Sequence, residues 1–556
     1  MKLVECVPNF SEGRDQGVID AIVAAIASVE GAHLLDVDPG RDTNRTVVTF
    51  VAPLERAAEA AFRGIAKAAE LIDMAKHHGE HPRMGATDVC PFVPLGTTTM
   101  DECVALARQL GERVGSELKI PVYLYEYAAT KDDRRNLAEI RAGEYEGLPA
   151  KLADAHWKPD FGPAKMNARA GATVIGARKF LIAYNVNLNT RDKKRASDIA
   201  LAIREQGRKK RDAHGQFVMD MNGDFIFDPG TLKVCKAVGW FIDEYQRAQV
   251  SINLTDFDVT PPHVAFEEVA RQAAERGLRA TGSELVGLVP LAAMRRAGQF
   301  YLDKQGASAG VPEPMLVETA IQSLGLRELG GFDPMQKIIE YCVAGDSPLA
   351  SSSVREFVDV TSTDAPVPGG GSVAALCGSL AASLTAMVAN LTHGKKGYES
   401  VSSEMSTLAT QAQSLKDEFL RAVDDDARAF DAVMVANRLP KATPDELARR
   451  EAAIQAATQR AIDVPFGVMR LCEKTLPLVE RVAEKGNKNS ISDAGVAALV
   501  LGAAVGGAWL NVLINLPGLG DRDQANRLRK DGDAVARRIA DAAQSIANRV
   551  AEGLHA

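Results

Sequence analysis

The sequence predicts a multidomain protein: two α/β (mixed-sheet) subdomains followed by an all-α helical bundle. Strand and helix patterns alternate up to about residue 326, whereas few strand signals follow Val354. Between these regions, residues 327–349 contain the glycine, proline and serine typical of a linker. A chain of 556 residues is long enough for about three or four domains. We therefore expect subdomains at 1–179 and 180–326, a linker at 327–349 and a helical domain at 350–556.

Short apolar runs and amphipathic segments predict the elements of the first subdomain. In chain order we expect strands at Leu3–Val7, His33–Val37, Thr46–Ala52, Cys90–Pro94 and Val122–Tyr125, and helices at Asp15–Ser28 and Leu54–Ala75. For the second subdomain we expect strands at Lys179–Leu188 and Gln249–Leu254 and helices at Pro262–Arg276 and Met315–Leu324.

The helical domain is predicted from long apolar periodicities at helical spacing. Its expected helices are Val373–Thr392, Ser402–Asn437, Pro444–Glu484, Asp493–Ile514 and Asp521–Gly553. The low-charge stretch Val496–Leu519 is interrupted by glycine and asparagine, which favours a buried helix over a membrane span. We expect no short internal repeat.

Composition excludes several classes of protein. The formal net charge of −8 argues against nucleic acid as the main partner. Seven cysteines without a C-x-x-C pair indicate reduced thiols, neither a disulfide framework nor a zinc site. The N-terminal residues MKLVECVPNF contain no apolar core of a signal peptide. We therefore expect a soluble, cytoplasmic protein that binds neither metal nor membrane.

The most informative motif is Pro368-Gly369-Gly370-Gly371-Ser372. Three consecutive glycines let the backbone approach a ligand closely. A helix starting at Ser372 would direct its N–H groups and positive dipole end at an anion. No Gly-Lys-Ser/Thr follows, so a nucleotide P-loop is the weaker interpretation.

Helical spacing separates Asp426 from its acidic neighbours. Phe419, Ala422, Phe430 and Val433 lie at offsets of −7, −4, +4 and +7, so Asp426 falls within the apolar stripe. Asp424 and Asp425 point away from that stripe, and Asp424 is placed to pair with Arg428. A buried carboxyl suits acid/base chemistry, and the alternative is a structural aspartate that holds helix ends together.

The last apolar helix carries three further candidates. We expect Ser492-Asp493 to cap its N-terminus. Asn511 and Asn515, four residues apart, share a face, where they either meet a ligand or form hydrogen bonds across the bundle.

In the first half, His81 follows Glu80 and precedes Pro82, which favours an extended loop. A loop histidine beside acidic and basic groups suits proton transfer near neutral pH, and a surface or capping role is the alternative. A second cluster, Asp36 to Arg45, surrounds the turn Pro39-Gly40 and includes Asp38, Arg41 and Arg45. It is either a substrate site or a solvated hairpin with ion pairs.

Two further segments favour a polar ligand. Asn185, Asn187 and Asn189 lie on one face of a strand, where asparagine is uncommon, so they contact a ligand or form a solvated sheet face. Upstream, the flexible segment Gly162–Gly171 is placed to lie over such a ligand. That segment consists of Gly162, Pro163, Ala164, Lys165, Met166, Asn167, Ala168, Arg169, Ala170 and Gly171. We expect the basic runs Arg191–Arg195 and Arg208–Arg211 to be solvated, although a polyanionic tail would suit them.

Several long motifs resemble known families. The segments VECVPNFSEGRD (4–15), GEHPRMGATDVCPF (79–92), GARKFLIAYNVNL (176–188), QVSINLTDFDVTPPH (249–263) and GSELVGLVPLAAM (282–294) resemble the glutamate formimidoyltransferase family. The segments APVPGGGSVAA (365–375), DDDARAFDAVM (424–434), SDAGVAAL (492–499) and NVLINL (511–516) resemble the formimidoyltetrahydrofolate cyclodeaminase family. Together they cover nearly the whole chain, in the order found in fused bifunctional enzymes.

The resemblance implies two reactions. The first transfers a formimino group from N-formimino-L-glutamate to tetrahydrofolate, and the second closes the ring to 5,10-methenyltetrahydrofolate with release of ammonia. It assigns the transferase acid/base to His81, a folate-binding segment to Gly162–Gly171 and the cyclodeaminase aspartate to Asp426. Asn9, Asp38, Arg41 and Arg45 are weaker candidates for substrate contacts, and Gly369, Gly370 and Gly371 for folate contacts.

The family further implies polyglutamylated tetrahydrofolate as co-substrate, no metal, and ring-like homo-octamers. The segment Arg208–Lys233 is longer and more polar than expected for the animal-type enzyme. Two alternatives remain: a transferase fused to a methenyltetrahydrofolate cyclohydrolase, and a non-catalytic folate-binding scaffold.

Overall fold

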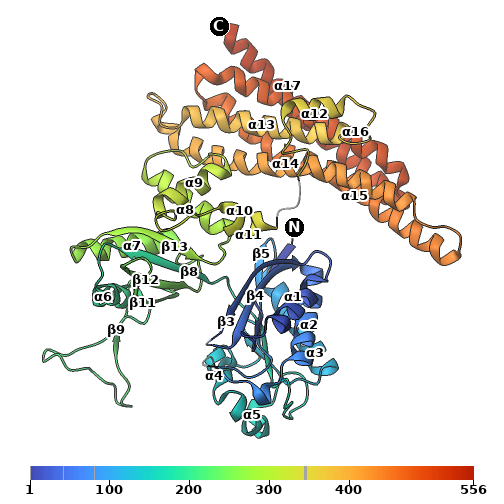
Figure 1. Cartoon of the computed structure of the whole chain (residues 1–556). Helices are drawn as coiled ribbons and strands as arrows, with labels where there is room; N and C mark the ends of the chain where they lie inside the picture. Colours follow the sequence, from blue (N-terminus) through green and yellow to red (C-terminus); the bar gives the residue numbers. More distant parts are fainter. Residues whose placement is uncertain (1, 42, 80–81, 344–346, 556) are drawn as a thin grey trace. The chain divides into compact units, whose positions relative to one another are not determined.

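A computed structural model describes residues 2–41, 43–79, 82–343 and 347–555. The chain forms two compact units (Figure 1). The first contains Met1–Ala297 and Ile321–Ala344, and the second Gly298–Ala320 and Gly345–Ala556. The predicted fold class, α/β with mixed sheets followed by long helices, is confirmed.

A seven-stranded mixed sheet forms the core of the N-terminal half of the first unit. Its hydrogen-bonded order is β1-β4-β2-β5-β7-β6, and β3 pairs with β4. Strand β7 runs parallel to β5 and β6, and the other pairs are antiparallel. The strands are β1 (Lys2–Cys6), β2 (Asn9–Phe10), β3 (His33–Gly40), β4 (Arg45–Pro53), β5 (Thr87–Gly96), β6 (Val122–Glu126) and β7 (Thr173–Ala177).

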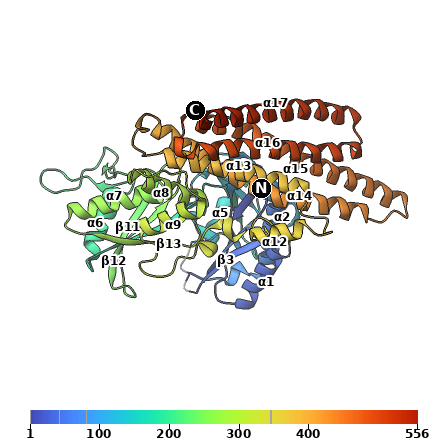
Figure 2. The same cartoon turned by 90° about the horizontal axis from the view of Figure 1, so that it is seen from above.

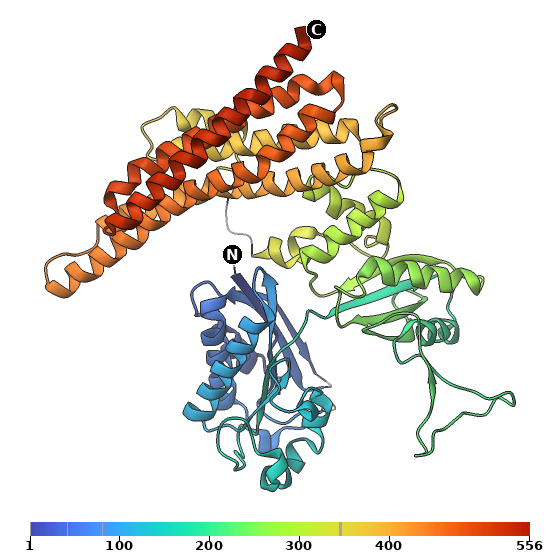
Figure 3. The same ribbon diagram turned by 180° about the vertical axis from the view of Figure 1, so that it is seen from behind.

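Helices pack on both faces of this sheet. Three long helices, α1 (Gln16–Ala27), α2 (Leu54–Leu71) and α3 (Met100–Glu117), lie together along one side of it (Figure 3). They bury one face in a core that includes Phe10, Phe50 and Phe92. On the other face, residues of α4 (Leu137–Arg141) and α5 (Glu144–Ala153) form a smaller core with Tyr123 and Tyr125.

A four-stranded antiparallel sheet follows, in the order β11-β12-β8-β13. Its strands are β8 (Ile182–Leu188), β11 (Cys235–Ile242), β12 (Arg247–Leu254) and β13 (Ala280–Val286). Helices α6 (Lys193–Ile203) and α7 (Pro262–Glu275) pack against it.

The predicted linker, 327–349, contains two short helices, α10 (Pro334–Lys337) and α11 (Ile339–Cys342), and Ile338 forms a bridge with Val289. Its residues 344–346 lie outside the described residues. The preceding helices α8 (Leu291–Lys304) and α9 (Glu313–Leu324) each cross the unit boundary, because Gly298–Ala320 groups with the helical unit. The linker boundaries therefore stay a prediction.

Between α6 and β11 the chain makes an arm that contains an internal repeat, contrary to expectation. Three eight-residue copies start at Lys209, Phe217 and Phe225, and an aspartate recurs at 212, 220 and 228. The copies close into a ring: Val218 N donates to Lys210 O, Ile226 N to Val218 O, and Lys210 N to Ile226 O, at 2.8–3.0 Å. Strands β9 (Arg208–Lys209) and β10 (Phe227–Asp228) join its two ends. The repeat escaped sequence analysis because the first copy carries cations where the others carry apolar side chains.

The second unit is a bundle of long helices that lie side by side (Figure 2). They are α13 (Gly370–Thr392), α14 (Ser402–Asn437), α15 (Pro444–Lys485), α16 (Ile491–Asn515) and α17 (Arg522–His555), with the short α12 (Val354–Thr361). Two segments, Gly370–Thr392 and Lys488–Gly518, are long and apolar enough to cross a membrane. Their most apolar stretches are 61% and 44% buried within the unit.

Two helix starts differ from expectation. Helix α13 begins at Gly370, not at Ser372, with Gly369 at its N-cap. Helix α16 begins at Ile491 after Ser490, so Ser492-Asp493 lies inside its first turn and is not the cap. A short 3₁₀ turn, Lys488–Ser490, leads directly into α16 and moves its start forward.

Candidate functional site

A cavity of about 280 Å³ in the helical unit brings together most of the residues predicted there. It is lined by Pro366, Val367, Gly369, Gly370, Gly371, Asp426, Ala429, Phe430, Val433, Ala461, Asn511, Ile514 and Asn515. These residues come from the segment that leads into α13 and its N-terminus, the C-terminal part of α14, α15 and the C-terminal end of α16. Rigid helices therefore carry most of this lining.

Asp426 is the acidic group of this cavity. Its Oδ2 lies 3.0 Å from Ser372 Oγ, which also lies 3.0 Å from the carbonyl oxygen of Val423. Burial raises the pKa of Asp426, and hydrogen bonds from Ser372 oppose the rise.

Ser372 accommodates both protonation states of Asp426. When the carboxyl is ionised, Ser372 donates to it. When the carboxyl is protonated, it donates to Ser372, and Ser372 donates to the Val423 carbonyl. The pair therefore accepts and returns a proton without moving its heavy atoms.

The glycine run gives this carboxyl its position. A Cβ at Gly371 would lie 2.1 Å from Asp426 Oδ1, so any other residue there would displace the carboxyl. A Cβ at Gly370 would lie 3.2 Å from Asn511 Nδ2. Since α13 begins at Gly370, its N-terminal N–H groups and dipole favour negative charge at this point.

Two amides form the wall contributed by α16. Asn511 Nδ2 donates to Gly507 O at 2.9 Å, and Asn515 Nδ2 donates to Asn511 O at 2.8 Å. Asn515 Nδ2 also lies 3.3 Å from Ala461 O. Both N–H groups of Asn515 thus have backbone acceptors, which leaves its oxygen as an acceptor, whereas Asn511 keeps its oxygen and a second N–H.

Asp493 does not belong to this site. It lies in the first turn of α16, whereas Asn511 and Asn515 lie near its end. At 1.5 Å per residue, eighteen residues separate Asp493 from Asn511 by about 27 Å. Asp493 therefore lies apart from this cavity, and its role in substrate binding stays a prediction.

The structure also corrects Asp424. It is 2% exposed, more deeply buried than Asp426, and its two oxygens accept hydrogen bonds from Leu349 N and Ala350 N at 3.0 and 3.1 Å. Arg428 pairs with Asp425 at 3.0 Å. Helical spacing did not predict this, because the segment that covers Asp424 lies 75 residues away.

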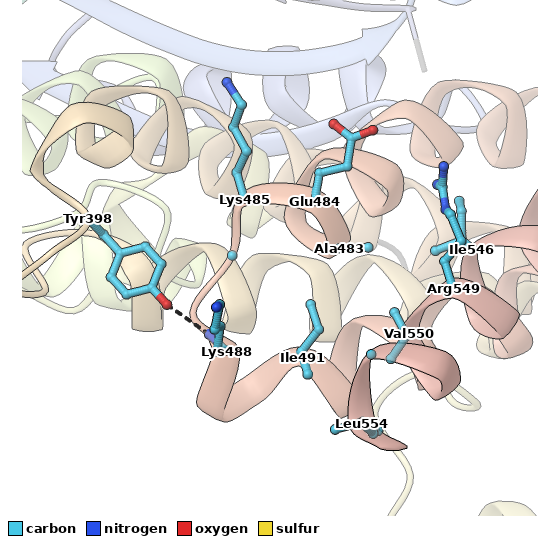
Figure 4. A pocket seen from close by; sticks show the side chains of 12 residues that line it. Tyr398, Ala483, Glu484, Lys485, Lys488, Ile491, Ile546, Arg549, Val550 and Leu554 are labelled. Carbon is cyan, nitrogen blue, oxygen red and sulfur yellow. Dashed lines mark hydrogen bonds between the residues drawn. The ribbon is translucent and has the colours of Figure 1, made fainter. Parts of the chain in front are cut away.

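A larger pocket of the helical unit lies away from this cavity. A pocket of about 560 Å³ is formed by the C-terminal ends of α15 and α17 and the start of α16, with Tyr398, Lys488, Ile491 and Val550 in its wall (Figure 4). Lys488 N donates to the Tyr398 hydroxyl at 3.0 Å. It contains none of the predicted site residues, and the length of α16 separates Ile491 from Asn511 by about 30 Å.

In the first unit, Asn9, Asp38 and Arg45 share a sheet face. Asn9 and Asp38 both pair with Val47, and Arg45 is two residues from Val47 on the same strand. Asn9 is buried, its Nδ2 donates to Val7 O at 2.8 Å, and its Oδ1 has no hydrogen-bond partner among the described residues. A buried acceptor of this kind costs about 1–3 kcal/mol, which a donor from a ligand or water would offset.

Two residues absent from the sequence prediction complete the charge pattern. Asp88 forms a buried ion pair with Arg141 and accepts a hydrogen bond from Met84 N at 3.0 Å. Burial lowers the pKa of Arg45, which Asp88 and Asp38 oppose, while Arg141 reinforces it. Arg41 is exposed in the turn, where its carbonyl accepts from Arg14 Nε at 3.0 Å.

Residues Met84–Ala86 lie against the C-terminal end of the segment Gly162–Gly171. Glu80 and His81 lie outside the described residues. Gly85 forms a bridge with Gly171, and Ala86 N donates to Ala170 O at 2.9 Å. A Cβ at Gly85 would lie 2.2 Å from Ala172 O, so this approach requires glycine.

Within the Gly162–Gly171 segment, side chains divide into anchored and open ones. Asn167 Oδ1 accepts from Ala170 N at 3.0 Å, and Arg169 Nη2 donates to Glu70 O. Exposed members of the segment are Gly162, Ala164, Lys165, Ala168 and Arg169, while Pro163, Met166 and Asn167 are partly buried.

Asn185 and Asn187 contradict the alternative of a solvated strand face. Asn187 is fully buried, its Nδ2 donates to Glu328 Oε2 at 2.7 Å, and its Oδ1 accepts from Gln249 Nε2 at 2.7 Å. Asn185 is 5% exposed and donates to Glu284 Oε2 at 3.3 Å. The face is therefore not solvated, and both polar atoms of the Asn187 side chain form hydrogen bonds within the protein.

Within the described ranges, no three His, Cys, Asp or Glu side chains lie close enough to share a metal ion. The sites are thus assembled from carboxyl, amide, guanidinium and backbone groups.

Three family models match the chain in sequence order. The formiminotransferase domain, N-terminal subdomain, matches residues 3–178, the formiminotransferase domain matches 183–344, and formiminotransferase-cyclodeaminase matches 353–534. Formimidoyltransferase-cyclodeaminase from Rattus norvegicus is 46% identical over 523 residues, 94% of this chain and 93% of the relative.

Two shorter relatives match one part each. Glutamate formimidoyltransferase from Thermoplasma acidophilum is 47% identical over 312 residues, 56% of this chain and 95% of the relative. Methenyltetrahydrofolate cyclohydrolase from Methylorubrum extorquens is 44% identical over 181 residues, 33% of this chain and 87% of the relative.

Proposed function

The chain belongs to the formimidoyltransferase-cyclodeaminase family, and from this premise we propose how its residues divide two reactions. The protein is a bifunctional enzyme that combines formimino transfer with ring closure of the transferred product. Its substrates are N-formimino-L-glutamate and tetrahydrofolate, and its products are glutamate, ammonia and 5,10-methenyltetrahydrofolate. The reactions serve the degradation of histidine.

In the first reaction, N5 of tetrahydrofolate attacks the formimino carbon and forms a tetrahedral intermediate. A proton leaves N5, and a proton reaches the departing glutamate nitrogen. We assign both transfers to His81, because an imidazole titrates near neutral pH. Asn9, Asp38 and Arg45 bind polar groups of the substrates, and Arg41 and Gly162–Gly171 contribute to folate binding.

In the second reaction, N10 attacks the formimino carbon bound to N5. The N10 proton goes to Asp426, and the same proton then reaches the amino group, which leaves as ammonia. The observation that carries this assignment is the half-buried Asp426 carboxyl held between Gly371 and Ser372. Asn511 and Asn515 accept hydrogen bonds from the pterin, and Gly369–Gly371 admit it closely.

One experiment tests which of the two residues serves which reaction. Formiminoglutamate and tetrahydrofolate are supplied to the full-length wild type, His81→Ala and Asp426→Asn. We expect His81→Ala to consume no formiminoglutamate, and Asp426→Asn to accumulate 5-formimino-tetrahydrofolate without methenyl product. His78→Ala and Asp425→Asn serve as matched controls, because each changes a residue of the same type that is close in sequence to the proposed one. Wild-type formation of methenyl product by Asp426→Asn would refute the assignment.

A second candidate for the helical unit is methenyltetrahydrofolate cyclohydrolase. The similarity to the Methylorubrum extorquens enzyme favours it. The two activities differ in their nitrogen balance: a cyclodeaminase releases one ammonia per methenyl group formed, and a cyclohydrolase releases none. Incubation with 5-formimino-tetrahydrofolate separates them, because only a cyclodeaminase releases ammonia and methenyl product from it.

We further propose a cytoplasmic homo-oligomer, with an octamer as the first hypothesis, that accepts polyglutamylated tetrahydrofolate. The family resemblance supports these statements, and the seven cysteines, all free, agree with a reducing compartment. Analytical ultracentrifugation tests the assembly, and competition between mono- and pentaglutamyl folates tests the tail.

A further inference from the structure

We propose that His77 and Arg83 are positioning residues of the transfer reaction: they lock both sides of the segment that includes His81 onto the neighbouring loops. The inference rests on the proposed function, because it takes His81 as the acid/base. It adds two residues that act through their hold on the backbone and make no contact with substrate.

Arg83 is saturated by protein acceptors. Its Nε donates to His77 Nδ1 at 3.3 Å, and Nη1 lies 2.9 Å from both Glu144 Oε2 and Glu146 Oε2. Its Nη2 donates to His77 O at 3.2 Å and to Glu146 Oε1 at 2.7 Å. A guanidinium has five N–H donors, and all five are used. Arg83 therefore has no donor left for a substrate carboxylate.

His77 is held as one tautomer. Because Arg83 Nε only donates, His77 Nδ1 must accept and carries no proton. The ring proton is then on Nε2, which donates to Asn44 O at 2.8 Å. A second proton would sit on Nδ1, facing the Arg83 N–H. Neutral His77 thus accepts the hydrogen bond from Arg83, and protonation of Nδ1 breaks this bond.

The electrostatic surroundings favour this neutral state. Burial lowers the pKa of His77, and Arg83 and Arg14 lower it further, while the hydrogen bond to Asn44 and the charge of Glu12 oppose them. Glu144 and Glu146 reach His77 only through Arg83.

Asn44 ties this lock to two other segments. Its Oδ1 accepts from Gly13 N at 3.0 Å, and its Nδ2 donates to His78 O at 3.0 Å. A Cβ at Gly79 would lie 2.2 Å from Thr43 O, so the loop lies directly on this turn. The β2–α1 connection, the β3–β4 turn and the loop from His77 are joined at a single asparagine.

The far side of the loop is fixed as firmly. Met84 N donates to Asp88 Oδ1 at 3.0 Å, and Ala172 N donates to Met84 O at 3.1 Å. Ser11 Oγ donates to Gly85 O at 2.8 Å. Both flanks of residues 80 and 81 are therefore bonded to the segments that carry Asn9, Arg45 and Ala170. Loosening a flank lowers the share of molecules with the acid/base aligned, which lowers kcat more than it raises KM.

The test measures both activities on the full-length protein. Variants are Arg83→Met, His77→Leu and His77→Gln, and the control is Arg113→Met, which removes an arginine bridging Glu59 and Glu117 on the surface. We expect Arg83→Met and His77→Leu to lower the transfer kcat about 10- to 100-fold, the effect of losing a buried hydrogen-bond partner. KM for formiminoglutamate and ring closure of added 5-formimino-tetrahydrofolate should stay at wild-type values.

His77→Gln gives a readout that a purely structural role would not move. Glutamine keeps a donor for Asn44 O and cannot be protonated. Its transfer kcat should exceed that of His77→Leu. In the wild type, protonation of His77 lowers kcat at acid pH, and this fall should be absent from the kcat–pH profile of His77→Gln.

Wild-type transfer kcat in Arg83→Met, or a change in KM alone, would overturn the proposal. If Arg83→Met also slows ring closure, the double variant Glu144→Gln/Glu146→Gln is measured instead, because it removes exposed partners of Arg83. Unchanged transfer kcat in that double variant would also overturn the proposal. Absence of transfer in the wild type would instead refute the proposed function.

Discussion

The two candidate sites are built in opposite ways. In the helical unit, long helices carry Asp426, Asn511 and Asn515, and one absent Cβ at Gly371 makes room for the carboxyl. In the first unit, strand ends and loops carry the candidate residues, and hydrogen bonds between distant segments hold them. The helical site therefore depends on shape, whereas the other depends on a polar network.

The largest expected effect tests whether the helical site stands alone. Asp426→Asn removes the titratable group and keeps its size, so we expect ring closure to fall about 1,000-fold, within the range for loss of a general acid/base. Formimino transfer should be unchanged. The measurement is methenyl absorbance from added 5-formimino-tetrahydrofolate. An equal loss of transfer would break the comparison, because the two sites would then be coupled.

Gly371→Ala tests the role of shape. The new Cβ would lie 2.1 Å from Asp426 Oδ1, so the carboxyl must move away from Ser372. Displacement of a catalytic group by about 1 Å costs on the order of 100-fold in rate. Gly502→Ala on α16 is the control, since its Cβ would only reach ordinary contact at 3.7 Å. Equal ring-closure rates in the two variants would contradict the argument from shape.

Glu5→Gln tests whether polar burial governs the first unit. Burial raises the pKa of Glu5 from 4.5 to about 7, opposed by Arg178. The folded state thus binds this proton more tightly than the unfolded state, so its contribution is full below pH 4.5 and is lost as pH rises through 7. We expect Glu5→Gln to stabilise the protein by about 2 kcal/mol at pH 8, after loss of the Arg178 attraction, and to leave stability at pH 4.5 nearly unchanged.

Chemical denaturation at the two pH values measures the effect on the transition of the first unit. Glu55→Gln, on the same unit, is the control and should show no difference between pH 4.5 and 8 beyond that of the wild type. A pH-independent effect of Glu5→Gln would mean that its carboxyl is ionised throughout.

The smallest expected effect concerns Asp424. Asparagine accepts only one of the two hydrogen bonds from Leu349 N and Ala350 N, so Asp424→Asn should destabilise the helical unit by about 1 kcal/mol. Asp425→Asn should change stability less. Ring closure should persist in both, since Asp424 contacts the chain and not the cavity. A greater loss of ring closure than of stability would show that the segment 347–353 shapes the site.

Sequence reasoning succeeded where a repeating geometry acted. The bounds Ser402–Asn437 were predicted to the residue, and the other four long helices of the helical unit to within three residues at each end, whereas α2 ends four residues before the predicted Ala75. Helical spacing also led to Asp426 and the face shared by Asn511 and Asn515, because 3.6 residues per turn places residues four apart side by side.

Sequence reasoning failed where contacts between residues far apart in the sequence determine the structure. Asp424 is buried by a segment 75 residues away, and Arg83 meets Glu146 at a separation of 63 residues. Asn187 is satisfied by Glu328, 141 residues along the chain. A local pattern carries no signal for such partners. Helix α3, Met100–Glu117, was also absent from the prediction, although its capping box, Thr99 with Glu102, was readable.

The arm between α6 and β11 is a self-contained insertion. Its backbone bonds close on themselves, and Arg208 pairs with Asp228, so entry and exit of the chain lie side by side. Excision of residues 209–227 and religation through a tight turn should therefore leave the parent sheet intact. Met221, wholly exposed at its tip, offers a place to attach a label.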